Sequence, residues 1–141
     1  MRLIMFSDYA LRMLMYAAGC DRLFTIEEVA TAYGISRTHM MKVANVLTRT
    51  GYLKAVRGRS GGLILAKPLG KINLRELVEA TEPDFALVEC FGCANHCPIT
   101  RSCKLRAALT EALDAFTRVL GRYTLADLAL APAEIRRLNR R

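Results

Sequence analysis

The stretch that decides the fold is YGISRTHMMKVANVLTRTGYLKAVRGRSGGLILAKP, residues 33–68. Ser36 can cap a helix that follows it, and Gly51 can end that helix. A shorter helix is expected before the YGIS turn, because Thr25 and Glu28 have the spacing of the reciprocal capping pattern. Two short helices joined by this tight turn predict a helix-turn-helix.

The second half of the same stretch predicts a β-hairpin. Residues 52–56 and 63–66 are apolar or alternating, and three glycines lie between them at Gly58, Gly61 and Gly62. A helix-turn-helix that is followed directly by a basic hairpin is a winged helix. The hairpin is then the wing, at about residues 52–67.

Further helices are predicted on both sides of the winged helix. An apolar stripe predicts one over residues 4–18, and a capping asparagine predicts another that begins at Asn73. Over residues 104–120 apolar residues recur every three or four positions, which makes a stripe about 26 Å long. Because this helix lies outside the winged-helix core, it is expected to pack against its copy in a second subunit. Thr124 is expected to cap a last short helix.

These elements predict a mainly α protein, a winged helix-turn-helix DNA-binding domain with a long dimerisation helix and a cysteine-rich cluster-binding loop. The parts are residues 1–80, the winged helix; 81–103, a connector and cluster-binding loop; 104–130, the dimerisation helix and a short C-terminal helix; and 131–141, a tail. The end of this tail, RRLNRR at residues 136–141, is expected to be frayed.

The charge of the chain is unevenly distributed. The formal net charge is +8, and residues 1–70 hold ten Lys and Arg against four Asp and Glu. The first half is therefore the candidate for contact with a polyanion, although charge alone fits a solvated basic surface equally well. No apolar run reaches the eighteen or so residues of a membrane span, and Asp8 and Arg12 interrupt the N-terminal apolar run. We expect a cytoplasmic protein with no membrane partner.

The expected DNA-binding residues lie on the third helix and on the wing. A winged helix places its third helix in the major groove, where base edges carry a distinguishable code. Residues that can bond bases or phosphates there are Ser36, Arg37, Thr38, His39 and Lys42 on the helix, and Arg57, Arg59 and Ser60 on the wing. The apolar residues of the same helix, Met40, Val43, Ala44 and Leu47, are expected in the core.

Four of the five cysteines fall within fourteen residues, at Cys90, Cys93, Cys97 and Cys103. Structural zinc sites usually have two tight pairs of cysteines across a long spacer. Here the cysteines are separated by two, three and five residues within one loop, a spacing that suits an iron–sulfur cluster better. Thiolates are soft ligands for either metal, so zinc and a redox dithiol switch stay open. We expect Cys20 to be an ordinary buried thiol and His96 to be an exposed loop residue.

With these residues in view, the chain resembles the winged-helix iron–sulfur transcriptional repressors of the IscR, RirA and NsrR type. The resemblance covers the chain to about residue 130. It rests on MRLIMFSDYALRMLMY, YGISRTHMMKV, GYLKAVRGRSGG, the Cys90, Cys97 and Cys103 pattern, and YTLADL. SDYALR and YGISRTHMMKV look most like NsrR, the nitric-oxide-sensitive repressor, whereas FALVEC is similar to RirA, the iron-responsive one.

The resemblance implies a homodimer with one cluster per subunit, [4Fe-4S] or else [2Fe-2S]. The implied ligands are Cys90, Cys97 and Cys103, with Asp8 of the other subunit as the fourth. Cys93 departs from the family pattern and is the alternative fourth ligand. If Cys93 binds, the site lies within one subunit and coupling through Asp8 is lost.

The function that this resemblance implies is repression from a double-stranded, palindromic DNA operator, which nitrosylation or loss of the cluster releases. An iron-responsive or cluster-status regulator of the same family is the alternative, and a zinc-stabilised DNA-binding protein is a further one. An enzyme is not expected, because the chain shows neither a nucleotide-binding glycine pattern nor a paired acid and base.

Overall fold

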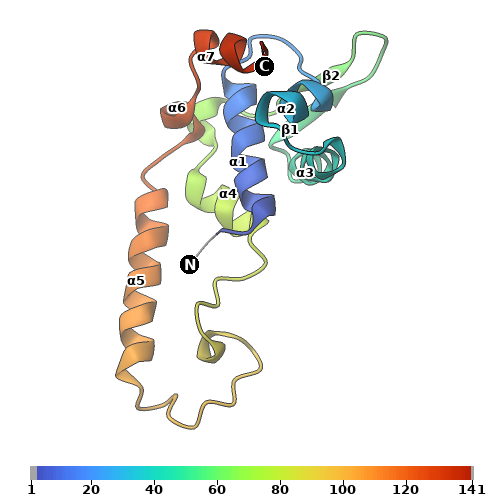
Figure 1. The fold of residues 1–141 in the computed structure, drawn as a ribbon. Helices are drawn as coiled ribbons and strands as arrows, with labels where there is room; N and C mark the ends of the chain where they lie inside the picture. Colours follow the sequence, from blue (N-terminus) through green and yellow to red (C-terminus); the bar gives the residue numbers. More distant parts are fainter. Residues whose placement is uncertain (1–2, 141) are drawn as a thin grey trace.

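The computed structural model describes residues 3–140, so Met1, Arg2 and Arg141 of the predicted first and last parts lie outside the described residues. The expected mainly α winged helix is confirmed (Figure 1). The elements are α1 Met5–Ala18, α2 Ile26–Tyr33, α3 Arg37–Arg49, β1 Leu53–Val56, β2 Gly62–Leu65, α4 Leu74–Thr81, α5 Lys104–Leu120, α6 Leu125–Leu128 and α7 Pro132–Leu138, with short 3-10 turns at Leu69–Lys71 and Glu89–Phe91.

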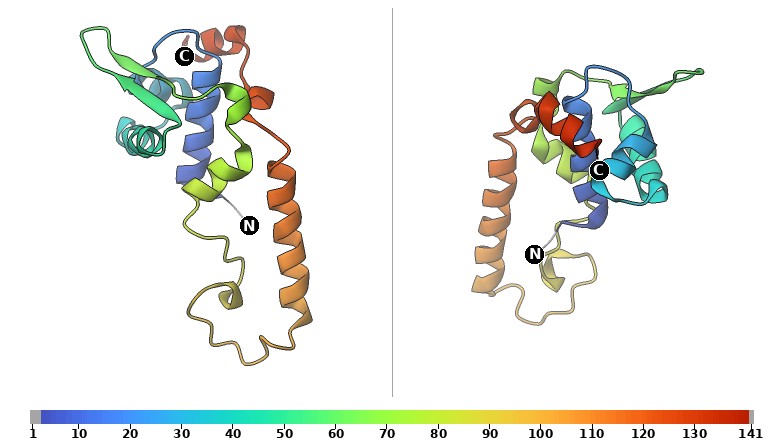
Figure 2. Two further views of the ribbon diagram at one scale, coloured as in Figure 1. Left: turned by 180° about the vertical axis from the view of Figure 1, so that it is seen from behind. Right: turned by 45° about the horizontal axis from the view of Figure 1, so that its top comes forward.

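Helix α1 lies at the centre of the upper part of the molecule, between α3 on one side and α4 on the other (Figures 1 and 2). Its buried stripe repeats at three and four residues and includes Ala10, Met13, Leu14 and Ala17. The expected core residues of α3 are buried against it: Met40, Val43, Ala44 and Leu47. Burial of apolar side chains on α1 therefore fixes where α3 lies.

The caps predicted from the sequence form the ends of α2 and α3. The Glu28 N–H donates to Thr25 Oγ1 at 3.1 Å, and the Thr25 N–H donates to Glu28 Oε2 at 2.6 Å. Burial opposes ionisation of Glu28, but hydrogen bonds from Arg22 and Thr25 outweigh it and lower the pKa of this carboxyl. Gly34 ends α2 with a φ of 63°, and the Ser36 side chain caps α3.

The wing is tied to the helix-turn-helix by backbone hydrogen bonds. Strands β1 and β2 pair antiparallel, from Leu53 with Leu65 to Val56 with Gly62. Phe24, just before α2, exchanges two hydrogen bonds with Leu63 of β2, at 3.0 and 2.7 Å. A Cβ at Gly62 would meet the Phe24 carbonyl oxygen at 2.7 Å, so this close approach requires glycine.

Helix α5 and the loop before it extend away from the winged helix (Figure 2). No residue of α5 is buried, and Leu105 on its apolar stripe is 64% exposed. The segment between α4 and α5, which holds the clustered cysteines, has one short 3-10 turn as its regular structure. Among the helices within residues 3–140, none has the length and apolar character needed to cross a membrane.

Residues 132–138 of the predicted tail form α7, so residues 136–138 of the RRLNRR stretch are helical where fraying was expected. Ile135 of α7 is buried. A Cβ at Gly19, the residue that follows α1, would meet Cγ1 of Ile135 at 2.7 Å, so α7 is in close contact with the end of α1. The Tyr16 hydroxyl of α1 donates to Asn139 Oδ1 at 2.8 Å. The sequence signal was weak because the segment is short and basic and depends on these tertiary contacts.

Replacing Ile135 with alanine should lower the free energy of unfolding by about 2 kcal/mol, because it empties a buried site between α7 and α1. Chemical denaturation measures this change. Arg136→Ala on the exposed side of the same helix is the control, with an expected change below about 0.5 kcal/mol. Equal stabilities for the two variants would mean that α7 is not part of the folded unit.

Candidate functional site

The N-terminal turn of α3 presents an exposed polar face. All five side chains that the sequence singled out there are exposed: Ser36, Arg37, Thr38, His39 and Lys42. Asn45 and Arg49 extend the same face and are also exposed. They were missed, although Asn45 is three residues after Lys42 and Arg49 is four after Asn45, a helical spacing that could have identified them.

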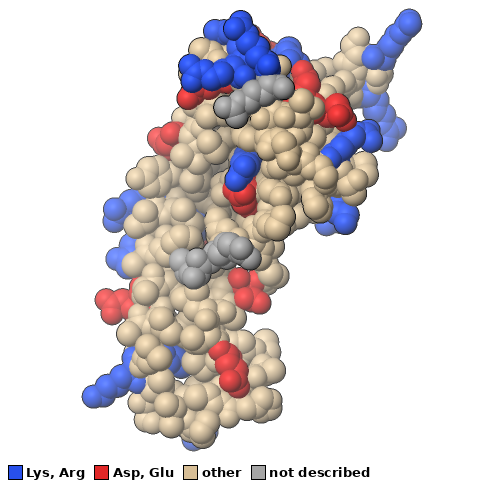
Figure 3. Space-filling model, in the orientation of Figure 1, with Lys and Arg blue, Asp and Glu red and all other residues tan. Residues whose placement is uncertain are grey.

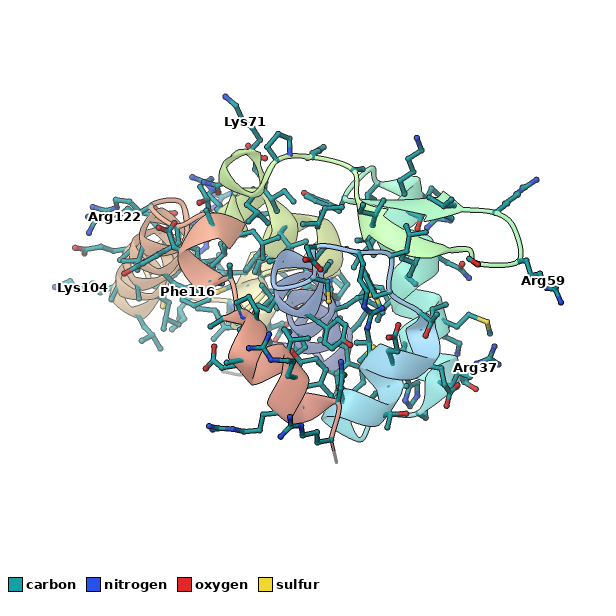
Figure 4. All side chains as sticks on the ribbon, turned by 90° about the horizontal axis from the view of Figure 1, so that it is seen from above. Arg37, Arg59, Lys71, Lys104, Phe116 and Arg122 are labelled. Atoms are coloured by element: carbon teal, nitrogen blue, oxygen red, sulfur yellow. The ribbon has the colours of Figure 1, made fainter. Side chains whose placement is uncertain are left out.

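The wing carries a second group of exposed residues, Arg57, Arg59 and Ser60. Gly58 takes a φ of 131°, which L side chains rarely adopt, and a Cβ at Gly61 would overlap the Val56 carbonyl. In Figure 4 Arg37 and Arg59 point outward on the same side of the molecule, opposite Lys104 and Arg122 of the α5 region. Basic residues on the wing and near α3 are visible along one edge in Figure 3. The structure thus brings the two predicted groups to one side.

Arg37 and His39 make side-chain contacts with neighbouring helices. Arg37 Nε lies 3.2 Å from Glu27 Oε2 of α2, and the two side chains are 68% and 67% exposed. Exposed pairs of this kind contribute little stability, so Arg37 can exchange its partner at low cost. The ring of His39 lies 6.1 Å, centroid to centroid, from that of Tyr9 on α1. The start of α3 is therefore in contact with α1.

The four clustered cysteines are free thiols in a loop of mostly irregular structure. Cys90 lies in the 3-10 turn Glu89–Phe91, and Cys103 directly precedes α5. Cys90, Cys97 and Cys103 are half-buried, whereas Cys93 is exposed. The three thiols of the implied ligand set thus share one degree of burial that Cys93 does not.

The donor set fits a thiophilic metal group chemically, since several thiolates in one adaptable loop are soft ligands. In the part of the chain that the structure describes, no three His, Cys, Asp or Glu side chains gather closely enough to hold a metal ion. A single subunit therefore does not bring together the predicted ligands Cys90, Cys97, Cys103 and Asp8, or Cys93 as the alternative. Their role stays a prediction.

Asp8 is held by Arg12 one turn further along α1. Its two carboxylate oxygens lie 3.0 Å from Arg12 Nε and 2.8 Å from an Arg12 terminal nitrogen. Both side chains are about two-fifths exposed, at 44% and 42%, so water screens the pair. The Arg12 guanidinium also lies 5.9 Å from the centroid of the Tyr33 ring. Binding of Asp8 to a metal would compete with Arg12 for the carboxylate oxygens.

The remaining cysteine and the loop histidine have ordinary environments. Cys20 is half-buried rather than fully buried, and burial raises the pKa of its thiol. A raised pKa leaves less thiolate, which is the form that binds metal. His96 is exposed, as expected, and its backbone N–H donates to Glu89 Oε1 at 2.8 Å.

Comparison with known proteins identifies the group to which this fold and these residues belong. Residues 5–131 match the Rrf2 family, described as "Iron-dependent Transcriptional regulator". The chain belongs to the Rrf2 family. Like that family it is a transcriptional regulator, and it is not an enzyme.

Two relatives of the Rrf2 chain match over nearly its whole length. Protein aau3 of Rhizobium meliloti is 46% identical over 137 residues, which cover 96% of this chain and 89% of that protein. The HTH-type transcriptional regulator NsrR of Bacillus licheniformis is 42% identical over 141 residues, which cover 98% and 99%. The resemblance expected from the sequence is thereby confirmed at the level of the family.

The solved structure of T. potens IscR supports the fold of this Rrf2 chain. It aligns with a TM-score of 0.71 at 20% identity and covers 91% of this chain and 85% of that one. At this identity the likeness concerns the fold alone, and it agrees with the winged helix described above.

Replacing Glu27 with glutamine should strengthen DNA binding about two- to fivefold, because it frees Arg37 and removes a negative charge beside it. Fluorescence anisotropy with a labelled mixed-sequence duplex over a salt series measures the change, which should shrink as salt rises. Glu79→Gln is the control, since Glu79 pairs with Arg75 at 2.7 Å on α4, across α1 from α3. A gain of the same size in both variants would show that net charge alone is responsible.

Proposed function

We propose that this chain is a cytoplasmic, homodimeric repressor that binds a palindromic DNA operator and senses nitric oxide through an iron–sulfur cluster. The observation that carries the proposal is the loop with Cys90, Cys97 and Cys103, in a chain 42% identical to an NsrR over nearly its full length. The DNA-binding residues are those of α3 and the wing, Ser36, Arg37, Thr38, His39, Lys42, Arg57, Arg59 and Ser60.

In this proposal Cys90, Cys97 and Cys103 of one subunit and Asp8 of the partner subunit hold one cluster, [4Fe-4S] in preference to [2Fe-2S]. The cluster, when bound, supplies iron that reacts with nitric oxide. A carboxylate binds iron less strongly than a thiolate, so Asp8 is the ligand that leaves most easily. Once released, Asp8 can return to its pair with Arg12 on the same helix.

The coupling to DNA runs through α1. Asp8 is on α1, and the buried stripe of α1 packs against α3. Engagement of Asp8 by the partner subunit would therefore hold the two α1 helices, and with them the two α3 helices, at one separation. Dimeric DNA-binding proteins require half-sites about 34 Å apart or a multiple of that, so small shifts in the separation of the two α3 helices would lower the affinity for DNA.

The exposed apolar stripe of α5 supports the homodimer. Leu105 and Val119 are 64% and 46% exposed on this helix, and no α5 side chain is buried within one subunit. A second copy of α5 would cover this stripe. The same contact would bring the cysteine loop of one subunit towards the partner, as the shared ligand set requires.

The decisive experiment compares cluster-loaded with cluster-free protein on its operator under anaerobic conditions. Loaded protein should bind and should release DNA on titration with nitric oxide, while the visible absorbance of the cluster changes in parallel. Equal affinity of the two forms would contradict the proposal. A colourless protein with stoichiometric zinc would support the zinc-stabilised alternative.

An iron-responsive or cluster-status regulator is the second candidate, and the iron-dependent description of the Rrf2 family favours it. Chelation of iron without nitric oxide separates the two. Release by chelation at a rate that matches cellular iron depletion, together with slow release by nitric oxide, would favour the iron signal.

Replacing Asp8 with asparagine should shift the visible spectrum of the loaded protein and speed its loss of DNA binding, because the carboxylate ligand is gone. Absorbance and DNA titration measure both effects. Asp21→Asn, at an exposed aspartate beyond the end of α1, is the control. If Asp8→Asn matches the unmodified protein and Cys93→Ser changes the spectrum, the fourth ligand is Cys93.

A further inference from the structure

Cys97 is fixed on both sides by two polar side chains of its own loop. Its backbone N–H donates to Asn95 Oδ1 at 3.0 Å, and the Thr100 hydroxyl donates to its carbonyl oxygen at 2.7 Å. The Asn95 amide in turn donates to Thr100 Oγ1 at 2.9 Å. Asn95 and Thr100, called here the Asn95–Thr100 clamp, therefore close a ring of hydrogen bonds around the peptide groups of Cys97.

Two further features restrict the same segment. Pro98 follows Cys97 and disfavours helical backbone at that cysteine. The N–H of His96 donates to Glu89 Oε1 at 2.8 Å, which connects Cys97 with the turn that holds Cys90. A hydrogen bond that involves no thiol thus joins the segments that hold Cys90 and Cys97, two of the predicted ligands.

The backbone of Cys93 is not restrained in this way. It is exposed, and in the described chain no side-chain hydrogen bond fixes its peptide groups. A thiol on unrestrained backbone loses more conformational freedom when it binds a metal than one whose backbone is already fixed. The clamp therefore favours Cys97 over Cys93 as a ligand.

We propose that Asn95 and Thr100 are positioning residues that set how tightly Cys97 holds a thiophilic metal, and hence how readily the cluster is lost. This inference rests on the proposed function and adds the regulation of that site. Outer groups that orient metal ligands commonly change metal affinity 10- to 100-fold when they are removed. The clamp does so through the backbone of Cys97 and leaves its sulfur free.

The test uses Co²⁺ alone with the full-length, reduced, metal-free protein, because cobalt–thiolate absorption reports thiolate binding directly. Thr100→Val keeps the shape of the side chain and removes the hydroxyl, and Asn95→Ala removes the acceptor of the Cys97 N–H. Each should weaken Co²⁺ binding about tenfold, and the double variant little more, because the two residues act as one unit. Ser102→Ala, a hydroxyl of the same loop outside the clamp, should leave affinity unchanged.

Hydrogen exchange at the Cys97 amide gives a metal-independent readout. Exchange should be faster in Asn95→Ala, because this N–H loses its acceptor, and unchanged in Ser102→Ala. Unaltered DNA binding to a mixed-sequence duplex confirms that the variants fold. Co²⁺ affinities equal to that of the unmodified protein would overturn the clamp alone, whereas an unmodified protein with no cobalt–thiolate band would contradict the proposed metal site itself.

Discussion

The contact between α1 and α3 is the interaction on which the rest of the molecule depends. Helix α1 is buried along one stripe against the helix-turn-helix, and it also carries the Asp8–Arg12 pair and the Tyr16 hydroxyl that bonds Asn139. Because cores are close-packed, α1 cannot move by much without moving α3 or opening a cavity. A single helix therefore connects the side proposed to face DNA, the proposed fourth ligand and the C-terminal helix.

The two ends of the molecule are built with different degrees of restraint. Caps at Thr25 and Ser36 and the backbone bridge from Phe24 to Leu63 fix the side that is proposed to face DNA. The cysteine loop is ordered mainly by local side-chain hydrogen bonds, and none of residues 82–103 is fully buried. Segments with few buried contacts open at low free energy, which suits a region whose metal must be able to leave. The more restrained part is thus the one proposed to bind DNA, and the less restrained part is the one proposed to hold the cluster.

Much of the fold could be predicted because its signals are local. The caps, the glycine that ends α2 and the core residues of α3 depend on neighbours within one or two turns. Helix α7 could not be predicted, since its stability comes from Ile135 against Gly19, residues far apart in the chain. The Glu27–Arg37 pair likewise depends on how α2 and α3 cross. The proposed ligand set is least accessible to sequence, because convergence of Asp8 with the thiols would require a second subunit.

The position of the fourth ligand decides whether this protein can be a switch at all. If every ligand came from the cysteine loop, loss of metal would relax that loop and leave α1 in place, so α3 would not respond. The proposed ligation by Asp8 would tie the loop of one subunit to α1 of the other. The screened, two-point pair with Arg12 suits this role, since it gives the free carboxylate a partner without holding it strongly. Arg12 thus offers the carboxylate of Asp8 a second partner, and a switch that works through the proposed ligation would need such an alternative state.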